Sequence, residues 1–353
     1  MSLSDNNNII KSHLKDEEKD SINNIIKKES SKQMTQKYHQ ISFEKNNNSS
    51  FLNIPLFSPS TEELNSYIPQ MSQKQVLNVF KSQNSTKQLQ KQLVGISKEN
   101  IDKIINELSG VFSKVIKDKN GNYFCSSLIN ICSQEQRIKI IKELTNTMNE
   151  DCNNEYGAHP IQNLIKSASS EEEFKLILSS FNDFTKIILA SMNKYGTYVI
   201  QKIFEYIPES IRTDFNLTFV NSSFFLSKDL YGVFAVRKFI AHTKNEYIVN
   251  TFFSLIMTNF VNISDNNYGN ILIQYLLEKW WNKREGQMLK CYIVSKFKDL
   301  SKKQYSVYVC NLYLKLCSEK EKELLFASFN KNSNKKKNKI LPKNINNKEK
   351  SDI

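Results

Sequence analysis

Thr197, Tyr198 and Gln201 carry a hydroxyl, an aromatic ring and an amide, groups that can hydrogen-bond to a ligand and stack against it. They occupy positions i, i+1 and i+4 of a predicted helix, so their side chains share one helical face. The apolar residues of the same segment form a neighbouring stripe with the spacing of a buried face: Val199, Ile200, Ile203 and Phe204. The sequence therefore predicts a helix that packs with one side and offers polar and aromatic groups with another.

The same arrangement recurs along the chain at steps of 36 to 39 residues. Each clear copy opens with a glycine, and these glycines are Gly121, Gly157, Gly196, Gly232 and Gly269. The same step leads forward to Ser306 and backward to Ser85. Only eight glycines occur in the 353 residues and five of them lie on this repeat, so the periodicity is not accidental. Seven units in register predict a repeat protein in which each unit packs on its neighbours.

Each unit predicts a short helix, a turn with the glycine, a long helix, a linker and a third helix. In the second unit these helices are expected at 111–117, 121–131 and 134–147. An Asp or Asn three residues before each glycine is expected to cap the helix by accepting backbone N–H groups: Asp118, Asn154, Asn193, Asp229 and Asn266. A tyrosine directly before four of the glycines is expected to pack between adjacent units.

A unit of about 36 residues, with Tyr-Gly-x-(aromatic)-x-x-Gln opening its middle helix, resembles the PUF (Pumilio) repeat family. The resemblance covers about residues 68–330 and is most specific in the five units that open with glycine. It implies an all-α fold, a right-handed superhelical crescent (α-solenoid) of seven to eight three-helix Pumilio-type repeats. It also implies that the middle helices line the concave face, where each meets one RNA base through three side chains.

The resemblance assigns two residues of each unit to the edge of an RNA base and a third to stacking. The base-edge positions are Thr86 and Gln90, Asn122 and Ser126, Ala158 and Gln162, Thr197 and Gln201, Val233 and Arg237, Asn270 and Gln274, and Val307 and Asn311. The stacking positions are Lys87, Tyr123, His159, Tyr198, Phe234, Ile271 and Tyr308. Four of these seven are Tyr or Phe and one is His, so five offer planar faces that suit a base.

The amide side chains predict which bases are preferred. Asn270 with Gln274 offers donors and acceptors that match uracil. Two other glutamine units resemble combinations that accept adenine or uracil: Thr197 with Gln201, and Ala158 with Gln162.

Two units depart from this pattern. Arg237 can only donate, so its unit should favour a base edge rich in acceptors; it resembles the cytosine-binding arrangement of the family, with Val233 in place of a small polar partner. In the last unit, Val307 and Asn311 stand where the family's guanine-binding unit has Ser and Glu. No eighth unit is visible in the sequence. These departures predict a relaxed or shifted target sequence instead of a strict UGU element.

Composition and motifs narrow the class of function. The net charge of +13 favours a polyanionic partner or an acidic surface, although a lysine-rich composition without functional purpose would give the same value. The sequence contains no glycine-rich phosphate loop, no His-Glu-x-x-His and no Gly-x-Ser-x-Gly, so we expect no enzyme, no catalytic residue and no cofactor. The six cysteines lack the close spacing of zinc ligands, which predicts reduced packing residues and no metal site.

The repeats are expected to occupy residues 66–330. Residues 1–65, rich in Asn, Ser and Lys, predict a disordered tail. Residues 331–353 carry eight lysines against two acidic residues and predict a disordered basic tail. No signal peptide and no apolar run of membrane-spanning length is present, which predicts a soluble protein that stays inside the cell.

The resemblance implies a function in RNA regulation. We expect the protein to bind single-stranded messenger RNA, in 3′ untranslated regions, one base per repeat, and to repress translation or promote decay. The implied partners are deadenylation or translation-repression proteins, the implied location is the cytoplasm with the nucleus or nucleolus as alternatives, and the expected state is a monomer. Two alternatives stay open: a divergent PUF-type factor in rRNA processing with relaxed specificity, and a helical-repeat scaffold that binds protein.

Overall fold

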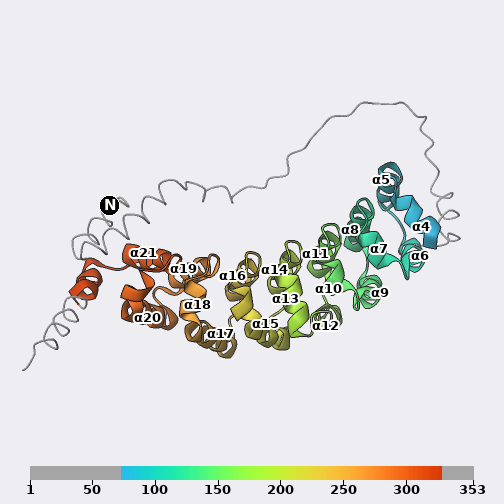
Figure 1. The fold of residues 1–353 in the computed structure, drawn as a ribbon. Helices are drawn as coiled ribbons and strands as arrows, with labels where there is room; N and C mark the ends of the chain where they lie inside the picture. The colour runs from blue at the N-terminus through green and yellow to red at the C-terminus, as the bar shows by residue number, and fades with distance from the viewer. Residues whose placement is uncertain (1–72, 328–353) are drawn as a thin grey trace, which may run out of the picture. The chain divides into compact units, whose positions relative to one another are not determined.

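The computed structural model describes residues 73–327, and all regular secondary structure in that range is helical (Figure 1). The expected tails, 1–65 and 331–353, lie outside the described residues, and the expected repeat domain of 66–330 is described from 73 to 327. The chain divides into two compact units, of which the structure describes 73–275 and 276–327. No helix within these ranges has both the length and the hydropathy that crossing a bilayer requires.

The helices follow one another in a three-part pattern. The short first helices are α4 (Gln73–Phe80), α7 (Phe112–Ile116), α10 (Met148–Asp151), α13 (Phe184–Ser191) and α18 (Phe260–Ser264). The second helices are α5 (Gln83–Gln92), α8 (Gly121–Ile131), α11 (Ala158–Ser167), α14 (Gly196–Tyr206), α16 (Gly232–His242), α19 (Gly269–Trp280) and α21 (Ser306–Leu316). The third helices are α6 (Lys98–Leu108), α9 (Gln134–Leu144), α12 (Glu171–Ser179), α15 (Thr213–Leu226), α17 (Glu246–Thr258) and α20 (Arg284–Leu300).

Within residues 73–275 the second helices α5, α8, α11, α14 and α16 pack side by side in chain order. Figure 1 shows them along one edge of this unit and the third helices along the opposite edge. The predicted second helix at 121–131 is confirmed at both ends by α8, whereas α9 ends three residues before the expected 147. The repeat spacing thus places these five second helices on a common side of the unit.

A continuous apolar core runs between the edges. The stripe expected from Val199, Ile200, Ile203 and Phe204 is fully buried. The ring of Phe204 lies 4.8 Å from the ring of Phe219 in α15 and 5.4 Å from that of Phe239 in α16, measured between centroids. Because each such ring removes a large apolar area from water, this chain of contacts joins neighbouring repeats into one core.

The Asp or Asn before each glycine holds the start of its second helix. Oδ1 of Asp118 accepts hydrogen bonds from the backbone N–H groups of Asn120 and Gly121, both at 2.8 Å. The same pair of bonds, 2.8 to 3.1 Å long, recurs at Asn154, Asn193, Asp229 and Asn266. The predicted capping role is confirmed at all five positions.

The glycine itself permits a close approach of backbone to backbone. A Cβ atom on Gly121 would lie 2.5 Å from the carbonyl oxygen of Val115, six residues earlier, and one on Gly232 would lie 2.5 Å from that of Leu226. Where the sequence has Ser306 instead, its hydroxyl donates to the carbonyl of Leu300, again six residues earlier, at 2.8 Å. The second helix therefore starts against the end of the preceding helix (α7, α15 or α20), with room for glycine or for a hydroxyl that bonds the facing carbonyl.

Residues 276–327 form their own small packing group. Helices α20 and α21 pack together, with the ring of Tyr313 6.1 Å from that of Trp281 and 6.4 Å from that of Phe297. The ammonium of Lys290 lies 4.2 Å from the centroid of the Trp281 ring. A further helical segment follows at 319–327.

The cysteines take packing positions. All six are free, five of them are buried, and Cys291 is exposed. Burial raises the pKa of the Cys317 thiol to about 11, so this group stays protonated at neutral pH. Within residues 73–327 no group of three or more His, Cys, Asp or Glu side chains is arranged to hold a metal ion.

Candidate nucleic-acid interface

The three predicted contact positions lie at three different depths, and the order of depths repeats in the second helices. The first base-edge position is buried in all seven units. The stacking position beside it is exposed in six units and half-exposed at Tyr308, with 58 % of Tyr123 and 56 % of Tyr198 accessible. The second base-edge position is half-buried in six units, and Ser126 is the buried exception. Each second helix therefore carries a buried anchor, an outward side chain directly after it, and a recessed group four residues after the anchor.

These positions form a row within residues 73–275, because α5, α8, α11, α14 and α16 are packed side by side. The row continues to α19 through a contact between Arg237 and Tyr275, whose ring centroid lies 4.6 Å from the guanidinium carbon. Val307, Tyr308 and Asn311 lie on α21, in the other compact unit, and show the same order of depths there. The structure thus brings together the predicted residues from Thr86 to Gln274.

Several first base-edge residues fasten the helix that carries them. The amide nitrogen of Asn122 donates to the carbonyls of Asp118 and Lys119 at 2.9 and 2.8 Å. Asn270 makes the equivalent two bonds at 2.8 Å each. The Thr197 hydroxyl instead donates to the carbonyl of Tyr231 in the next repeat at 3.1 Å. These side chains therefore have a structural role in addition to the base-edge role that remains a prediction.

Three of the four glutamines at the second base-edge position are oriented by their own helices, and the fourth, Gln90, donates from Nε2 to Oγ of Ser127 on α8 at 3.2 Å. Nε2 of Gln274 donates to Oδ1 of Asn270 at 3.0 Å, and Nε2 of Gln201 lies 3.4 Å from Oγ1 of Thr197. Nε2 of Gln162 donates to the carbonyl oxygen of Ala158 at 3.2 Å. One N–H of each of these three amides is used inward, so the carbonyl oxygen and the second N–H remain for a ligand. An adjacent donor and acceptor of this kind match the edge of uracil or adenine.

Comparison with known proteins follows the repeat pattern. The family model of the Pumilio-family RNA binding repeat matches residues 112–145 and 187–214. The first range contains α7, α8 and α9, and the second contains α14.

The chain has the fold of Pumilio-type repeat proteins.

Solved structures show the same fold. The Puf4 RNA binding domain bound to the HO endonuclease RNA 3′ UTR recognition sequence superposes with a TM-score of 0.62 at 21% identity, covering 67% of this chain and 73% of that one. The RNA-binding domain of yeast Puf5p bound to SMX2 RNA gives 0.60 at 20% identity, covering 70% of each chain. PUF-8 in complex with PBE-RNA gives 0.59 at 18% identity, covering 74% of this chain and 76% of that one. No curated protein sequence matches this chain. The expected all-helical Pumilio-type solenoid is confirmed.

The second helices carry a net positive charge, whereas the third helices do not. The seven second helices carry eight lysine or arginine side chains and two acidic ones. The six third helices carry ten basic and twelve acidic side chains. The excess of positive charge therefore lies on the same elements as the exposed rings, where a polyanion would be attracted.

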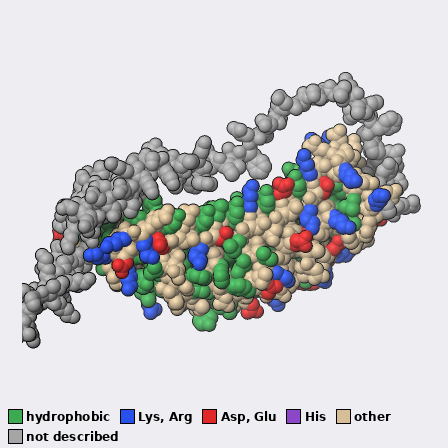
Figure 2. Space-filling model, in the orientation of Figure 1, with side chains coloured by type: hydrophobic (Ala, Val, Ile, Leu, Met, Phe, Trp, Pro, Cys, Tyr) green, Lys and Arg blue, Asp and Glu red, His purple; other side chains and the backbone are tan. Residues whose placement is uncertain are grey.

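Exposure of apolar side chains alone does not define the site. Figure 2 shows hydrophobic side chains over α13 and α15, where Phe184, Leu189 and Phe225 are exposed and the rings of Phe184 and Phe225 lie 6.0 Å apart. These residues do not follow a buried anchor that has a recessed amide four residues after it. The periodic combination of depths, not apolar exposure, distinguishes the row on the second helices.

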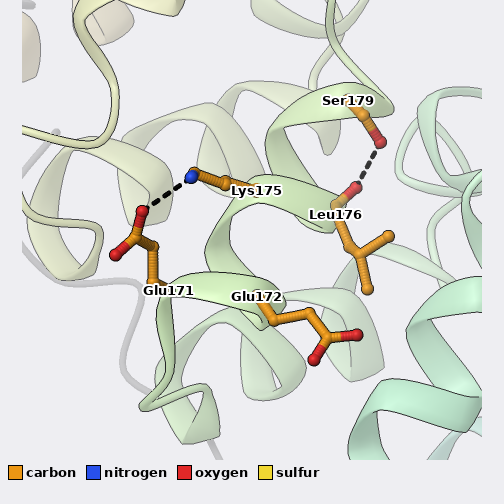
Figure 3. Close-up of a pocket in the computed structure, with 5 residues that line it drawn as sticks. All are labelled: Glu171, Glu172, Lys175, Leu176 and Ser179. Atoms are coloured by element: carbon orange, nitrogen blue, oxygen red, sulfur yellow. Dashed lines mark hydrogen bonds and ion pairs between the residues drawn. The ribbon is translucent and has the colours of Figure 1, made fainter.

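A surface pocket of about 410 Å³ lies away from the row, on the third helix α12 (Figure 3). Within it Nζ of Lys175 pairs with Oε1 of Glu171 at 2.6 Å, and the Ser179 hydroxyl donates to the carbonyl of Leu176 at 2.7 Å. All of its lining residues come from this one helix. The pocket contributes no residue to the candidate interface.

The sequence did not point to Tyr275, which contacts a residue of the candidate interface. Tyr275 directly follows Gln274 and contacts Arg237, yet it occupies none of the three positions that the family resemblance assigns. The equivalent position is Lys, Ser, Asn or Leu in the other units, so the aromatic residue at this position could have indicated it from the sequence.

Proposed function

We propose that this Pumilio-type protein binds single-stranded RNA, with about one base contacted by each second helix. The observation that supports this most directly is the repeated order of depths: a buried anchor, an exposed side chain that is mostly aromatic, and a half-buried polar group. An unpaired base placed on the exposed ring of Tyr198 would bring its edge to the recessed amide of Gln201. Stacking of this kind contributes about 1–3 kcal/mol per base.

The physical arrangement favours an unpaired strand. Stacking on an exposed ring requires a base that has left its own helical stack, which single-stranded RNA supplies at least cost. The eight basic side chains of the second helices support binding of the phosphate backbone. In this proposal the ring stacks on the face of a base, the amide hydrogen-bonds to its edge, and the basic side chains bind the phosphates.

We further propose messenger RNA as the target, with 3′ untranslated regions as the binding sites. Support comes from the fold likeness to Puf4, whose structure contains a 3′ UTR recognition sequence. Repression or decay of the bound message through deadenylation or translation-repression proteins is the outcome that the resemblance implies. In this proposal the protein acts as a monomer in the cytoplasm.

A second candidate function is RNA binding with relaxed specificity, as in a divergent PUF-type factor of rRNA processing. The observation that favours it is the chemistry of the first base-edge position, which is aliphatic in three of seven units. These aliphatic residues are Ala158, Val233 and Val307. In their units only the second base-edge residue has a side chain that can hydrogen-bond to a base. The nucleus or nucleolus would be the location for this role.

A salt titration separates RNA binding from a protein-binding scaffold. A short U-rich single-stranded RNA should bind with an affinity that falls on the order of tenfold or more between about 50 mM and about 200 mM salt, because bound phosphates release counterions. The same sequence in a duplex should bind more weakly, since its bases are stacked. Affinity for the single strand that is absent, or that is independent of salt and of strandedness, would contradict the proposal.

A further inference from the structure

Arg237 is the one charged side chain among the fourteen base-edge positions. It is half-buried on α16, and its guanidinium carbon lies 4.6 Å from the centroid of the Tyr275 ring on α19. Among the described residues no hydrogen bond or ion pair holds this guanidinium. A guanidinium over a ring is attracted by the negative face of the ring, and its N–H donors, which lie in the guanidinium plane, stay available for a ligand.

Three other units orient their second base-edge residue within their own helix, whereas Nε2 of Gln90 in α5 donates to Oγ of Ser127 on the next second helix, α8, at 3.2 Å. In α14 and α19 the glutamine is held by the side chain of the first base-edge residue, Thr197 or Asn270, and in α11 by the carbonyl of Ala158. The first residue of α16 is Val233, whose aliphatic side chain has no group to hold Arg237. The contact that orients the second residue therefore comes from the next repeat in this unit.

Tyr275 is unusual for its position in the repeat. It directly follows the second base-edge residue, and the equivalent residues of the other units are Lys91, Ser127, Asn163, Lys202, Lys238 and Leu312. An aromatic residue thus occurs here only in the unit that neighbours the arginine. Burial raises the pKa of the Tyr275 hydroxyl, against the opposite effect of the Arg237 charge, so the ring stays neutral at physiological pH.

We propose that Tyr275 is a positioning residue that fixes Arg237 for a base with two adjacent acceptors, which on the Watson–Crick edge is cytosine. This inference rests on the proposed RNA-binding function. Cytosine presents N3 and O2 side by side as acceptors, whereas uracil alternates acceptor and donor and adenine pairs a donor with an acceptor. Two parallel N–H groups of a held guanidinium match the cytosine pair in bidentate fashion. The ring supplies the orientation that Val233 does not.

Selection from a pool of random single-stranded RNA tests this role. The Arg237→Ala variant first identifies which position of the selected sequence α16 contacts. At that position, Tyr275→Leu should lower the enrichment of cytosine at least about fivefold, since a partly desolvated cation–π contact is lost. The enrichment at all other positions should be unchanged, which a merely structural defect would not produce. Tyr275→Phe keeps the ring and should retain the cytosine preference.

A second variant at Tyr275 tests whether a loss of preference comes from misfolding. A matched control changes the same repeat position in another unit. Tyr275→Lys introduces the residue found at the equivalent sites 202 and 238, so it is compatible with the helix, and should also lose the preference by repelling Arg237. Asn163→Ala alters the same repeat position in α11 and should leave it intact. Unchanged cytosine enrichment in both Tyr275→Leu and Tyr275→Lys, or equal loss at every position, would overturn the positioning role. If the unsubstituted protein enriches no RNA sequence, the proposed function itself fails.

Discussion

The three predicted contact residues of each second helix differ in burial, and each has a different role. In α19 the buried Asn270 binds backbone carbonyls at the start of its own helix, and its oxygen accepts a hydrogen bond from Gln274. Gln274 is thereby oriented at half depth, while Ile271 projects outward. Because the polar group is held before a ligand arrives, binding a base costs less side-chain entropy than it would with a free glutamine.

The glycine at the start of the second helix gives a prediction at the same scale. A Cβ on Gly196 would lie 2.5 Å from the carbonyl oxygen of Ala190 and would also meet Oδ1 of Asn153. The Gly196→Ala variant should therefore lose about 1–3 kcal/mol of unfolding free energy, the usual cost of overpacking. Denaturant unfolding followed by circular dichroism measures this loss. Unchanged or increased stability would show that the two helices do not approach so closely.

The sequence predicted which residues project outward but not what the buried ones bond to. The spacing of Tyr198 beside Val199 and Ile200 fixes which face is buried, so its exposure could be predicted from periodicity. By contrast, Asn122 can point its amide at a ligand or at the carbonyls three and four residues earlier, and the sequence does not distinguish these. Tyr275 was missed because its partner Arg237 lies 38 residues away on another helix.

Third helices are joined by a buried ion pair. Nε of Arg137 on α9 lies 2.7 Å from Oε1 of Glu173 on α12, and both side chains are almost completely buried. The other carboxylate oxygen of Glu173 accepts the backbone N–H groups of Ser169 and Ser170, each at 2.9 Å. One carboxylate thus caps its own helix and links it to the preceding repeat.

This pair predicts a pH dependence of stability. Burial raises the pKa of Glu173, but the hydrogen bonds from Arg137, Ser169 and Ser170 outweigh it, and the net pKa lies below the ordinary value of 4.5. Its contribution is therefore complete above pH 4.5 and is lost as the pH falls through the lowered pKa. Glu173→Gln should cost about 1–3 kcal/mol at neutral pH.

Thermal unfolding at a series of pH values tests this prediction. The difference in melting temperature between the unsubstituted protein and Glu173→Gln should be constant from neutral pH down to about 4.5 and shrink below it. Glu172→Gln, on the same helix with a solvent-exposed pair to Lys142, is the matched control and should change the melting temperature little. A difference that grows on acidification would contradict the assignment.

Helix boundaries were predictable where the capping residues are explicit. Asp118 and Gly121 mark the start of α8, and the expected bounds of that helix are confirmed. The third helix of one repeat and the first of the next, expected to be separate, form one helix in α15. There Ser222 and Ser223 donate to carbonyls four residues earlier, so these hydroxyls are satisfied within the helix instead of ending it.

At the scale of the whole chain, the repeat of 36 to 39 residues carries both the fold and the candidate interface. It places one outward side chain and one recessed group on each second helix, and those helices carry the net positive charge. Because periodicity is visible in the sequence, the repeat architecture could be predicted before any side-chain contact was known. The difference in net charge between second and third helices could be predicted only once the bounds of the helices were known.

The most direct test removes one ring and its amide from the row. Tyr198→Ala combined with Gln201→Ala should weaken binding of a short U-rich single-stranded RNA about tenfold or more in an anisotropy titration, with helical content unchanged. Tyr247→Ala is the matched control, because that ring is 70 % exposed but lies on the third helix α17. Affinity should fall in the double variant and stay constant in the control. Equal affinity in both variants and the unsubstituted protein would contradict RNA binding by the second helices.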